Sequence, residues 1–470
     1  MKQYLVLASL LLVHIASAQT LKQNLEKAYA HFEQDEQLNY GISSLAVINA
    51  STGELIFSKN GTTGLAPAST LKTITAATAL ALLGENFTWE TILGYSGDIV
   101  QGTLTGDLIL KGGGDPTLGC SRYAQTTKNV LFEKWINAIR QTGIKKINGR
   151  VLVDDRLFGT QTLPEGWIWQ DIGNYFGAGA SSVSWNENQF GLIFQPAATT
   201  GSPTKLLHSE PQIPYLKIIN EVKTGEPGSG DNVYAYSAPY SDIIYLRGTY
   251  ASDLKKTILI SIPDPAFEIA FRLQDTLKQL GIQTTNTPST ARRLIADHIQ
   301  VADSCRIISV HQSPRLKQVI DPFNQKSINL YGEILIKTLA WKQGRTISTA
   351  EGVNIVKDYW TNKLGININA MNITDGSGLS PATRITTESI AKILASAKNE
   401  PWFNTLYQSL PINNNMKMKS GSIHDVLAYA GYQPNVNGTF LAFSFIINNY
   451  NGNTALIRQK MFSVLNTLKQ

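Results

Sequence analysis

The spacing of apolar residues changes several times along the first third of the chain, and each change marks an expected element. Apolar residues from Leu21 to Phe32 recur at helical spacing, which predicts an amphipathic helix. After Gly41 the period shortens, and residues 42–48 and 54–57 are β-rich runs on either side of a turn sequence. The pattern therefore predicts a helix followed by a β-hairpin.

The next segment, residues 67–83, is an alanine- and leucine-rich stretch that stops at Gly84. Its composition and its glycine stop predict a strongly apolar helix. Ser69 and Lys72 fall in the first turn of that helix.

Residues 95–304 differ in character, because short apolar runs alternate with Gly, Pro, Asn and Asp. They predict a mostly β insertion of one or two extra domains. Expected beyond it are helices at 324–341 and 387–398, strand-like runs at 419–431 and 439–448, and a short packed helix at 454–470.

This order of elements predicts an α+β fold in which one domain is split by its own insertion. The split domain is expected to comprise residues 19–94 and 305–470, with residues 95–304 inserted between them.

The first 18 residues have the features of a secretory signal peptide: Lys2, an apolar core and the small-residue ending Ala16-Ser17-Ala18. The apolar core is too short to span a bilayer, and no later run is long enough for a transmembrane helix. We expect a protein that crosses the inner membrane and works in the periplasm without a stable membrane anchor.

Composition excludes several classes of function. The net charge of +6 is spread along the chain without a basic block, which argues against a nucleic-acid partner. The histidines show no paired-ligand spacing, and Cys120 and Cys305 cannot build a zinc site, so no metal and no cofactor are expected. The two cysteines could form at most one disulfide, and the sequence leaves open whether they meet.

Ser69 and Lys72 are the first candidates for chemistry. Serine is a weak nucleophile until a base lies beside it, and positions i and i+3 share one face of a helix. Ser-x-x-Lys recurs at 202–205 and 252–255, but only Ser69 opens a strong apolar helix. The alternative for Ser69 is a plain helix cap.

Two further elements add to this pair. Ser327-Ile-Asn329 opens the helix expected at 324–341, and its alternative is again a cap. Lys419-Ser-Gly421 opens a strand-like run, where a lysine can meet a substrate carboxylate and a glycine lets a backbone approach. Each has a second copy, at 184–186 and at 223–225, and we interpret the latter as a loop without a strand partner.

Ser-x-x-Lys, Ser-x-Asn and Lys-Ser/Thr-Gly, each on its expected element, resemble the motifs of penicillin-binding proteins and serine β-lactamases. The interval of about 250 residues between the first two motifs is similar to that of the low-molecular-mass class C D-alanyl-D-alanine carboxypeptidases/endopeptidases. Serine at 420 departs from the threonine usual in that group but keeps the hydroxyl. Further segments that look like family signatures are 112–118, 147–154, 175–180 and 375–380.

The resemblance implies an antiparallel five-stranded sheet flanked by helices and a β-lactam-sensitive acyl-enzyme mechanism on peptidoglycan stem peptides. It implies that Ser69 attacks the peptide carbonyl, that Lys72 takes the proton and that Ser327 returns one to the leaving amine. The implied substrate-binding residues are Asn329, Lys419, Ser420, Gly421, Ser422 and Asp154.

Some alternatives remain open at this point. Glycines 112–114 could cradle a phosphate, but a tight turn in a β domain fits better because no phosphate-loop lysine follows. The resemblance places Asp154 opposite the diaminopimelate arm of the stem peptide, whereas an ordinary exposed carboxylate is the alternative. A β-lactamase or esterase, and a non-catalytic wall-binding scaffold, are the rival functions.

Overall fold

The computed structural model describes residues 21–470 and divides into two compact units. The predicted signal peptide, residues 1–18, lies outside the described residues. Among the described residues, unit 1 contains 21–85, Ile320–Ser327 and Val353–Gln470, and unit 2 contains Asn86–Val319 and Ile328–Gly352.

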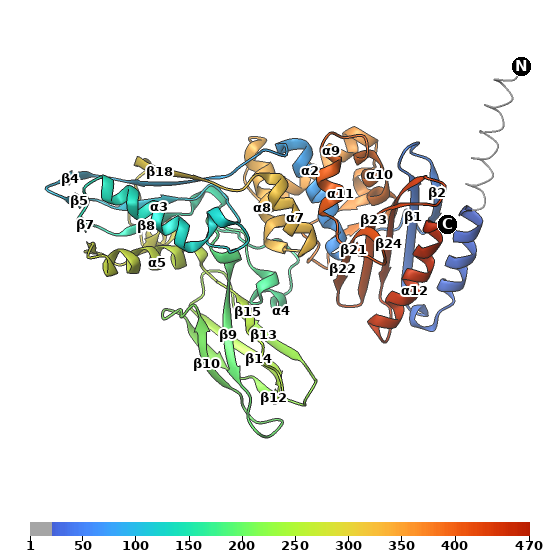
Figure 1. Cartoon of the computed structure of the whole chain (residues 1–470), viewed down its shortest axis with the longest axis horizontal. Helices are drawn as coiled ribbons and strands as arrows, with labels where there is room; N and C mark the ends of the chain where they lie inside the picture. Colours follow the sequence, from blue (N-terminus) through green and yellow to red (C-terminus); the bar gives the residue numbers. More distant parts are fainter. Residues whose placement is uncertain (1–20) are drawn as a thin grey trace, which may run out of the picture. The chain divides into compact units, whose positions relative to one another are not determined.

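Unit 1 is built on one antiparallel sheet in the order β2-β1-β24-β23-β22-β21 (Figure 1). Five long strands match the sheet that the resemblance implies, and the two-residue β21 extends it at one edge. The strands are β1 (Ile42–Asn49), β2 (Leu55–Lys59), β21 (Ile412–Asn413), β22 (Met416–Ile423), β23 (Val426–Pro434) and β24 (Phe440–Asn448).

Helices cover both faces of this sheet because successive side chains of its strands point to opposite sides. Leu45, Val47 and Phe443 face the helix over 21–33 and α12 (Thr454–Asn466), where they share one hydrophobic core. On the other face, the Ser44 hydroxyl lies 2.6 Å from that of Thr387, the first residue of α10 (Thr387–Ala397). The predicted hairpin, the helix at 387–398 and the terminal helix are confirmed.

The apolar segment at 67–83 begins as a 3₁₀ turn, η2 (Ala68–Leu71), and continues as α2 (Lys72–Leu83). Gly84 ends it with a φ of 81°, a conformation that glycine adopts without strain. The predicted helix is confirmed, with a tighter first turn than expected.

Unit 2 contains the insertion, and its first core is formed by two sheets and two helices. Apolar residues of α3 (Lys128–Gln141) and α5 (Pro265–Gln279) pack into one core with the strands. The sheet orders are β17-β8-β6-β3-β18 and β16-β7-β5-β4. Their strands are β3 (Glu90–Tyr95), β4 (Asp98–Val100), β5 (Thr103–Thr105), β6 (Leu108–Lys111), β7 (Lys146–Asn148), β8 (Val151–Asp154), β16 (Gln283–Thr284), β17 (Ser289–Thr290) and β18 (Arg306–Gln312).

A second core in unit 2 is almost entirely β. It joins a sheet of order β10-β9-β15 to a sheet of order β11-β14-β12, in which β13 also pairs with β14. The strands are β9 (Gln189–Gln195), β10 (Lys205–Glu210), β11 (Lys217–Asn220), β12 (Lys223–Gly225), β13 (Asp231–Tyr236), β14 (Ile243–Ala251) and β15 (Ile258–Ser261).

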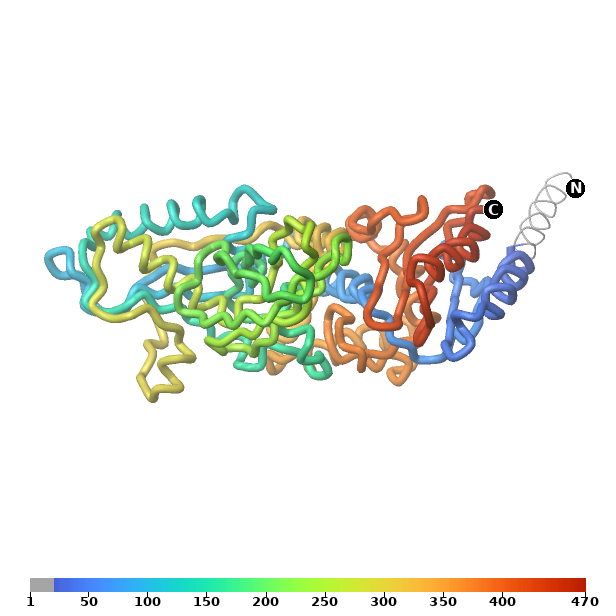
Figure 2. The backbone as a smooth tube through the Cα atoms, turned by 90° about the horizontal axis from the view of Figure 1, so that it is seen from below, coloured from blue at the N-terminus to red at the C-terminus, as the bar shows by residue number. Residues whose placement is uncertain are grey.

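The ends of the insertion differ from the boundaries expected at 94/95 and 304/305. β3 and β18 pair antiparallel at the two ends of the insertion, where the blue and the gold segments run side by side (Figure 2). This pairing draws both strands into unit 2, so the units divide at Glu85 and at Val319. α8 (Asn329–Lys342) also belongs to unit 2.

Several expected elements need correction. The helix expected at 324–341 is two helices, α7 (Leu316–Gln325) and α8, and the strand expected at 419–431 is the end of β22 and most of β23. Asp425, with a φ of 52°, makes the turn between those strands. α9 (Thr349–Leu364) and α11 (Phe403–Ser409), like α3 and α5, were not expected from the sequence pattern.

Within residues 21–470, no helix is both long and apolar enough to cross a membrane. Cys120 and Cys305 are free thiols, and Cys120 is buried. The disulfide that the sequence left open is therefore not formed in this structure.

Candidate active site

Ser69 lies in the 3₁₀ turn η2, three residues before Lys72, which begins α2. The Nζ of Lys72 donates to Ser69 Oγ over 2.9 Å and to the carbonyl of Ser377 over 2.8 Å. Lys72 is fully buried, whereas Ser69 is half-buried. The structure thus places an amine in hydrogen-bond contact with an accessible hydroxyl.

The capping alternative for Ser69 does not hold. The N-cap positions of η2 and α2 are Pro67 and Leu71, and neither helix start is capped by a side chain. The Ser69 hydroxyl is held by Lys72, so it is not engaged in closing the helix terminus.

The backbone just before Ser69 is strained. Ala68 has a φ of 44°, a left-handed conformation that is unfavourable for a residue with a Cβ. Two residues earlier, both backbone polar groups of Ala66 bond to the side-chain amide of Asn448. The amide accepts from the Ala66 N–H over 2.8 Å and donates to the Ala66 carbonyl over 3.1 Å. Strained residues of this kind concentrate at functional sites, because the surrounding structure must hold them in place.

The loop at 375–381 supports the same turn from another side. A Cβ on Gly378 would lie 2.0 Å from the Ala68 carbonyl oxygen, so only glycine fits there. The buried carboxylate of Asp375 accepts from the Ser380 N–H and the Thr383 hydroxyl, each over 2.8 Å. This network presents the Ser377 carbonyl to Lys72.

Residues 375–380 look like a family signature in the sequence, but no role for Ser377 or Asp375 was expected. The signal that could have found them is the glycine-rich spacing itself. A loop with two glycines brings backbone carbonyls, rather than side chains, to a partner.

β22 runs directly against η2. A Cβ on Gly421 would lie 2.7 Å from both the Pro67 carbonyl oxygen and the Ser69 nitrogen. Real Cβ atoms do not approach other atoms so closely, so residue 421 must be glycine for the strand and the turn to touch. The contact brings the backbone of Ser69 and the edge of β22 together.

Lys419 lies two residues before that contact and is buried, with 2% of its surface exposed. Its Nζ donates to the Ser420 carbonyl over 2.8 Å. Burial lowers the pKa of the Lys419 ammonium to about 8. Ser420 is half-buried and Ser422 is exposed.

Ser327 lies in unit 1, between α7 and α8, with a φ of 57°. It does not cap α8, whose N-cap position is Ile328 without a side-chain bond. A half-buried serine in a left-handed conformation matches the strain seen at Ala68.

Asn329 is the first residue of α8 and belongs to unit 2. Its Nδ2 donates to the Phe176 carbonyl over 2.8 Å. The turn η5 (Tyr175–Gly177), part of another quoted signature, therefore orients the amide of Asn329.

Asp154 ends β8 in unit 2 and is buried, so the alternative of an ordinary exposed carboxylate is wrong. Its Oδ1 accepts from Arg156 Nε and its Oδ2 from Arg156 Nη2, each over 2.9 Å. Burial raises the pKa of this carboxyl, but the hydrogen bonds from Arg156 outweigh it and hold the pKa below its usual value. Asp154 is thus an ionised, partnered carboxylate.

The second copies of the motifs lack this organisation. Lys205 and Lys255 are exposed, and neither Ser202 nor Ser252 begins a helix. Lys223-Thr-Gly225 was expected to lie in a loop without a strand partner, and this is wrong. The segment forms β12, which pairs in parallel with β14. The glycine- and proline-rich residues that follow this three-residue strand made the sequence pattern there typical of a loop.

Glycines 112–114 follow β6 without forming a turn themselves, so the tight turn expected there is wrong; the turn lies at 116–118. The Gly112 N–H donates to the Asp154 carbonyl over 3.1 Å and the Gly114 N–H to the Ser182 carbonyl over 2.8 Å. Gly114 has a φ of 90°. Two of the three N–H groups are thus used within the fold, which fits a structural segment and not a phosphate cradle.

Metal ligands do not gather in this structure: across residues 21–470, no three His, Cys, Asp or Glu side chains are placed to share an ion.

Comparison with known proteins agrees with this geometry. Two D-alanyl-D-alanine carboxypeptidases are similar over most of the chain. One, from Actinomadura sp. strain R39, is 25% identical over 460 residues, which cover 92% of this chain and 82% of the relative. The other, DacB of Haemophilus influenzae, is 26% identical over 423 residues, which cover 86% of this chain and 84% of the relative.

Among solved structures, penicillin-binding protein 4 (dacB) of Haemophilus influenzae superposes with a TM-score of 0.76 at 24% identity, covering 96% of this chain and 99% of that one. The same protein complexed with a β-lactam gives a TM-score of 0.73 at 23% identity, covering 94% and 99%. The predicted fold class, an α+β penicillin-binding fold with extra domains, is confirmed.

The profile of one family matches residues 21–468, nearly the whole described chain. The chain belongs to the D-Ala-D-Ala carboxypeptidase 3 (S13) family.

Proposed function

We propose that this serine-type D-alanyl-D-alanine carboxypeptidase cleaves peptidoglycan stem peptides through an acyl-enzyme on Ser69. The observation that carries the assignment is the 2.9 Å contact from Lys72 Nζ to Ser69 Oγ, made where the backbone of β22 meets the same turn. A hydroxyl, a base and a strand edge for substrate are what acyl transfer to serine requires.

In the first step Lys72, in its neutral form, takes the Ser69 proton while Oγ attacks the carbonyl carbon of the penultimate D-alanine. The oxygen of the tetrahedral intermediate accepts hydrogen bonds from the backbone N–H groups of Ser69 and Ser422. Ser327 passes a proton to the leaving nitrogen, and the terminal D-alanine departs. Water then attacks the ester and regenerates Ser69.

Substrate binding falls to the remaining motif residues. Lys419 and Ser420 hold the terminal carboxylate, Gly421 lets the substrate backbone approach β22, and Asn329 binds a substrate amide. The bond that forms is between Oγ and the carbonyl carbon in every case. Release of a free D-alanine or of a cross-linked peptide differs only in what the leaving nitrogen carries, so the same residues serve carboxypeptidase and endopeptidase cleavage.

The pKa of about 8 for Lys419 predicts a pH dependence. Only the protonated amine attracts a carboxylate, and it is protonated below pH 8 and neutral above. We expect kcat/KM for a peptide with a free terminal carboxylate to fall above about pH 8, by roughly tenfold per pH unit at its steepest. A peptide with an amidated terminus should lack that fall, and equal profiles for the two peptides would contradict the role of Lys419.

Replacing Lys419 should show which of the two Lys-Ser/Thr-Gly sequences, at 419–421 or at 223–225, belongs to the active site. A charge-assisted hydrogen bond contributes about 1.5–3 kcal/mol, so Lys419→Ala is expected to lower the acylation rate at least about tenfold. Lys223→Ala, on the exposed end of β12, is the matched control and should leave the rate unchanged. An equal loss in both variants would mean that the wrong motif has been assigned.

Asp154 is proposed to read the amine of a diaminopimelate side chain, since its Oδ2 can accept a second bond beside the one from Arg156 Nη2. Asp154→Asn should lower kcat/KM several-fold for peptides that carry that amine relative to peptides in which it is acetylated. The ratio is the measurement, because loss of the Arg156 ion pair weakens the fold equally for both peptides. A ratio that stays at the wild-type value would assign Asp154 to structure alone.

Export to the periplasm is part of the proposal, because the substrate is assembled outside the inner membrane and residues 1–18 have the features of a signal peptide. β-Lactams are proposed to acylate Ser69, and the solved complex of the Haemophilus influenzae protein with a β-lactam supports them as inhibitors of this fold.

Labelling with a fluorescent penicillin, followed by peptide mass spectrometry, tests the proposed function. The adduct is expected on Ser69 and to persist for many minutes. Rapid hydrolysis of the adduct would favour a β-lactamase or esterase, and failure of every β-lactam to label the chain would favour a non-catalytic wall-binding scaffold.

A further inference from the structure

Several large aromatic side chains of unit 2 are exposed to solvent. Trp169 is 60% exposed, Tyr175 52% and Tyr245 38%. The other seven tryptophans, all within the described residues, are buried or only partly exposed. A lone tryptophan in water beside other exposed aromatic rings is unusual for a surface without a ligand.

Direct contacts connect Trp169 with the tyrosines of β13 and β14. The Trp169 ring lies 5.0 Å from the Tyr236 ring in an edge-on arrangement, and Tyr236 stands opposite Tyr245 in the pairing of β13 with β14. The guanidinium of Arg247 lies 5.2 Å from the Tyr236 ring centre and 5.8 Å from that of Tyr245. We call Trp169, Tyr175, Tyr236, Tyr245 and Arg247 the aromatic platform.

The platform is not needed to build a core. Val233, Ala235 and Leu246 point to the opposite face of the same strands and fill the second hydrophobic core of unit 2. Alternation along a strand therefore puts Tyr236 and Tyr245 on the outer face. Their position is not explained by the packing of the fold.

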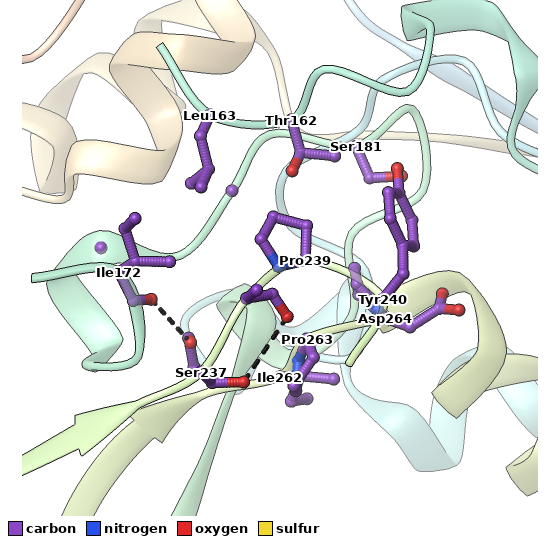
Figure 3. Close-up of a pocket in the computed structure, with 15 residues that line it drawn as sticks. Thr162, Leu163, Ile172, Ser181, Ser237, Pro239, Tyr240, Ile262, Pro263 and Asp264 are labelled. Atoms are coloured by element: carbon purple, nitrogen blue, oxygen red, sulfur yellow. Dashed lines mark hydrogen bonds between the residues drawn. The ribbon is translucent and has the colours of Figure 1, made fainter. Parts of the chain in front are cut away.

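The support of the platform is rigid. α4 (Trp169–Ile172) packs on β13, and the Asn174 side chain accepts from the Ala235 N–H over 3.2 Å. The Ser261 hydroxyl of β15 donates to the Ile172 carbonyl over 3.0 Å, and Figure 3 shows Ile172 at this junction beside a pocket. These bonds fix the backbone of α4 and β13, which carries Trp169 and Tyr236, and a fixed support lowers the entropy cost of binding.

The platform also lies next to a residue of the proposed site. Asn329 donates to the Phe176 carbonyl, and the ring of Tyr175 lies 5.4 Å from that of Phe176. The turn η5, which carries both rings, packs on α4, which carries Trp169. The elements that carry the platform therefore contact one another in the order η5, α4, β13 and β14, starting from the turn that holds Asn329; Figure 1 labels α4, β13 and β14.

We infer that the aromatic platform binds the glycan chain to which the stem peptides are attached. The inference rests on the proposed function, which places the stem peptide at Asn329. Four extended residues span about 13 Å, so the sugar at the far end of a bound stem peptide lies within a short distance of the scissile bond. A surface that begins beside Asn329 is where that sugar chain passes.

The chemistry of the platform fits a chain of pyranose rings. The apolar C–H face of such a ring packs flat on an aromatic side chain, and tryptophan and tyrosine offer the largest faces. Arg247 donates from Nε to Glu221 over 2.8 Å, and its guanidinium lies over the rings of Tyr236 and Tyr245. Its planar donors suit the hydroxyl and acetamido oxygens of amino sugars.

Binding to immobilised glycan strands that have been stripped of peptide tests the inference. The full-length mature protein is expected to bind them, and Trp169→Ala and Tyr245→Ala should each weaken binding at least about tenfold. Trp169→Phe keeps an aromatic face and should retain most of the affinity. Tyr40→Ala is the matched control, because Tyr40 is 81% exposed and lies in unit 1.

Penicillin acylation separates this inference from the proposed function. All four platform and control variants should acylate at the wild-type rate, and Ser69→Ala should still bind glycan strands. A wild-type protein that ignores peptide-free strands, or a Trp169→Ala variant that binds them normally or loses acylation in parallel, would overturn the inference. Normal glycan binding without any adduct on Ser69 would instead overturn the proposed function.

Discussion

Replacement of Ser69 by alanine is expected to abolish labelling by penicillin and to lower peptide cleavage by at least about 10³-fold. The Ser69 hydroxyl accepts a hydrogen bond from Lys72 and can form an acyl bond, whereas the Ser377 carbonyl, which also accepts from Lys72, cannot. The fold should survive the change, because Ser69 is half-buried and Lys72 keeps its bond to Ser377. Fluorescent penicillin on a denaturing gel, together with thermal unfolding, measures both effects.

The two other Ser-x-x-Lys sequences provide the controls. Ser202 and Ser252 stand outside helices, with Lys205 and Lys255 exposed to solvent, so their hydroxyls have no buried base. Ser202→Ala and Ser252→Ala should label as strongly as the wild type. Labelling that persists in Ser69→Ala would show that the nucleophile is elsewhere.

Local pattern predicted the parts of the site that depend on neighbours in sequence. Ser69 and Lys72 meet because three residues on a helical turn place them on one face, and that relation is legible without a structure. The β character of 419–431 and the helix that ends at Gly84 were equally visible, because strand-like residues and a glycine stop are local signals, although the turn at Asp425 that divides β22 from β23 was not.

Features that depend on distant parts of the chain were not predictable in the same way. The left-handed Ala68 is imposed by contacts with Gly378 and with the Asn448 side chain of β24 through Ala66. The strand at 223–225 exists because β14, some twenty residues later, offers it a parallel partner. The residues of these two segments alone could not predict such contacts, because the partners lie in other parts of the chain.

The missed helices have a different cause. α3 carries Leu131, Trp135 and Ile139 at helical spacing, and α5 begins after Asp264, whose side chain accepts from the Phe267 N–H as an N-cap. Both signals were present in the sequence. They were outweighed by the glycine- and proline-rich character of the insertion around them, so the whole segment was assigned to β structure.

Gly421 carries the second large expected effect. Alanine at 421 would place a Cβ 2.7 Å from the Pro67 oxygen and the Ser69 nitrogen, and 2.9 Å from the Thr70 nitrogen. All three atoms belong to backbone that cannot rotate away, so β22 and η2 must separate. Because the oxyanion donors and the nucleophile lie on these two elements, a displacement of about 1 Å is expected to slow acylation about 10²-fold or more.

The measurement for Gly421→Ala is the second-order rate of acylation by penicillin alongside the free energy of unfolding. Overpacking at one contact costs about 1–3 kcal/mol, so the variant should remain folded while acylation collapses. Gly64→Ala is the matched control, since a Cβ there meets only the Arg384 Cβ at an ordinary 3.6 Å. A Gly421→Ala variant that acylates at the rate of Gly64→Ala would show that β22 does not shape the oxyanion site, and the assignment of the Lys419-Ser-Gly421 strand edge would have to be given up.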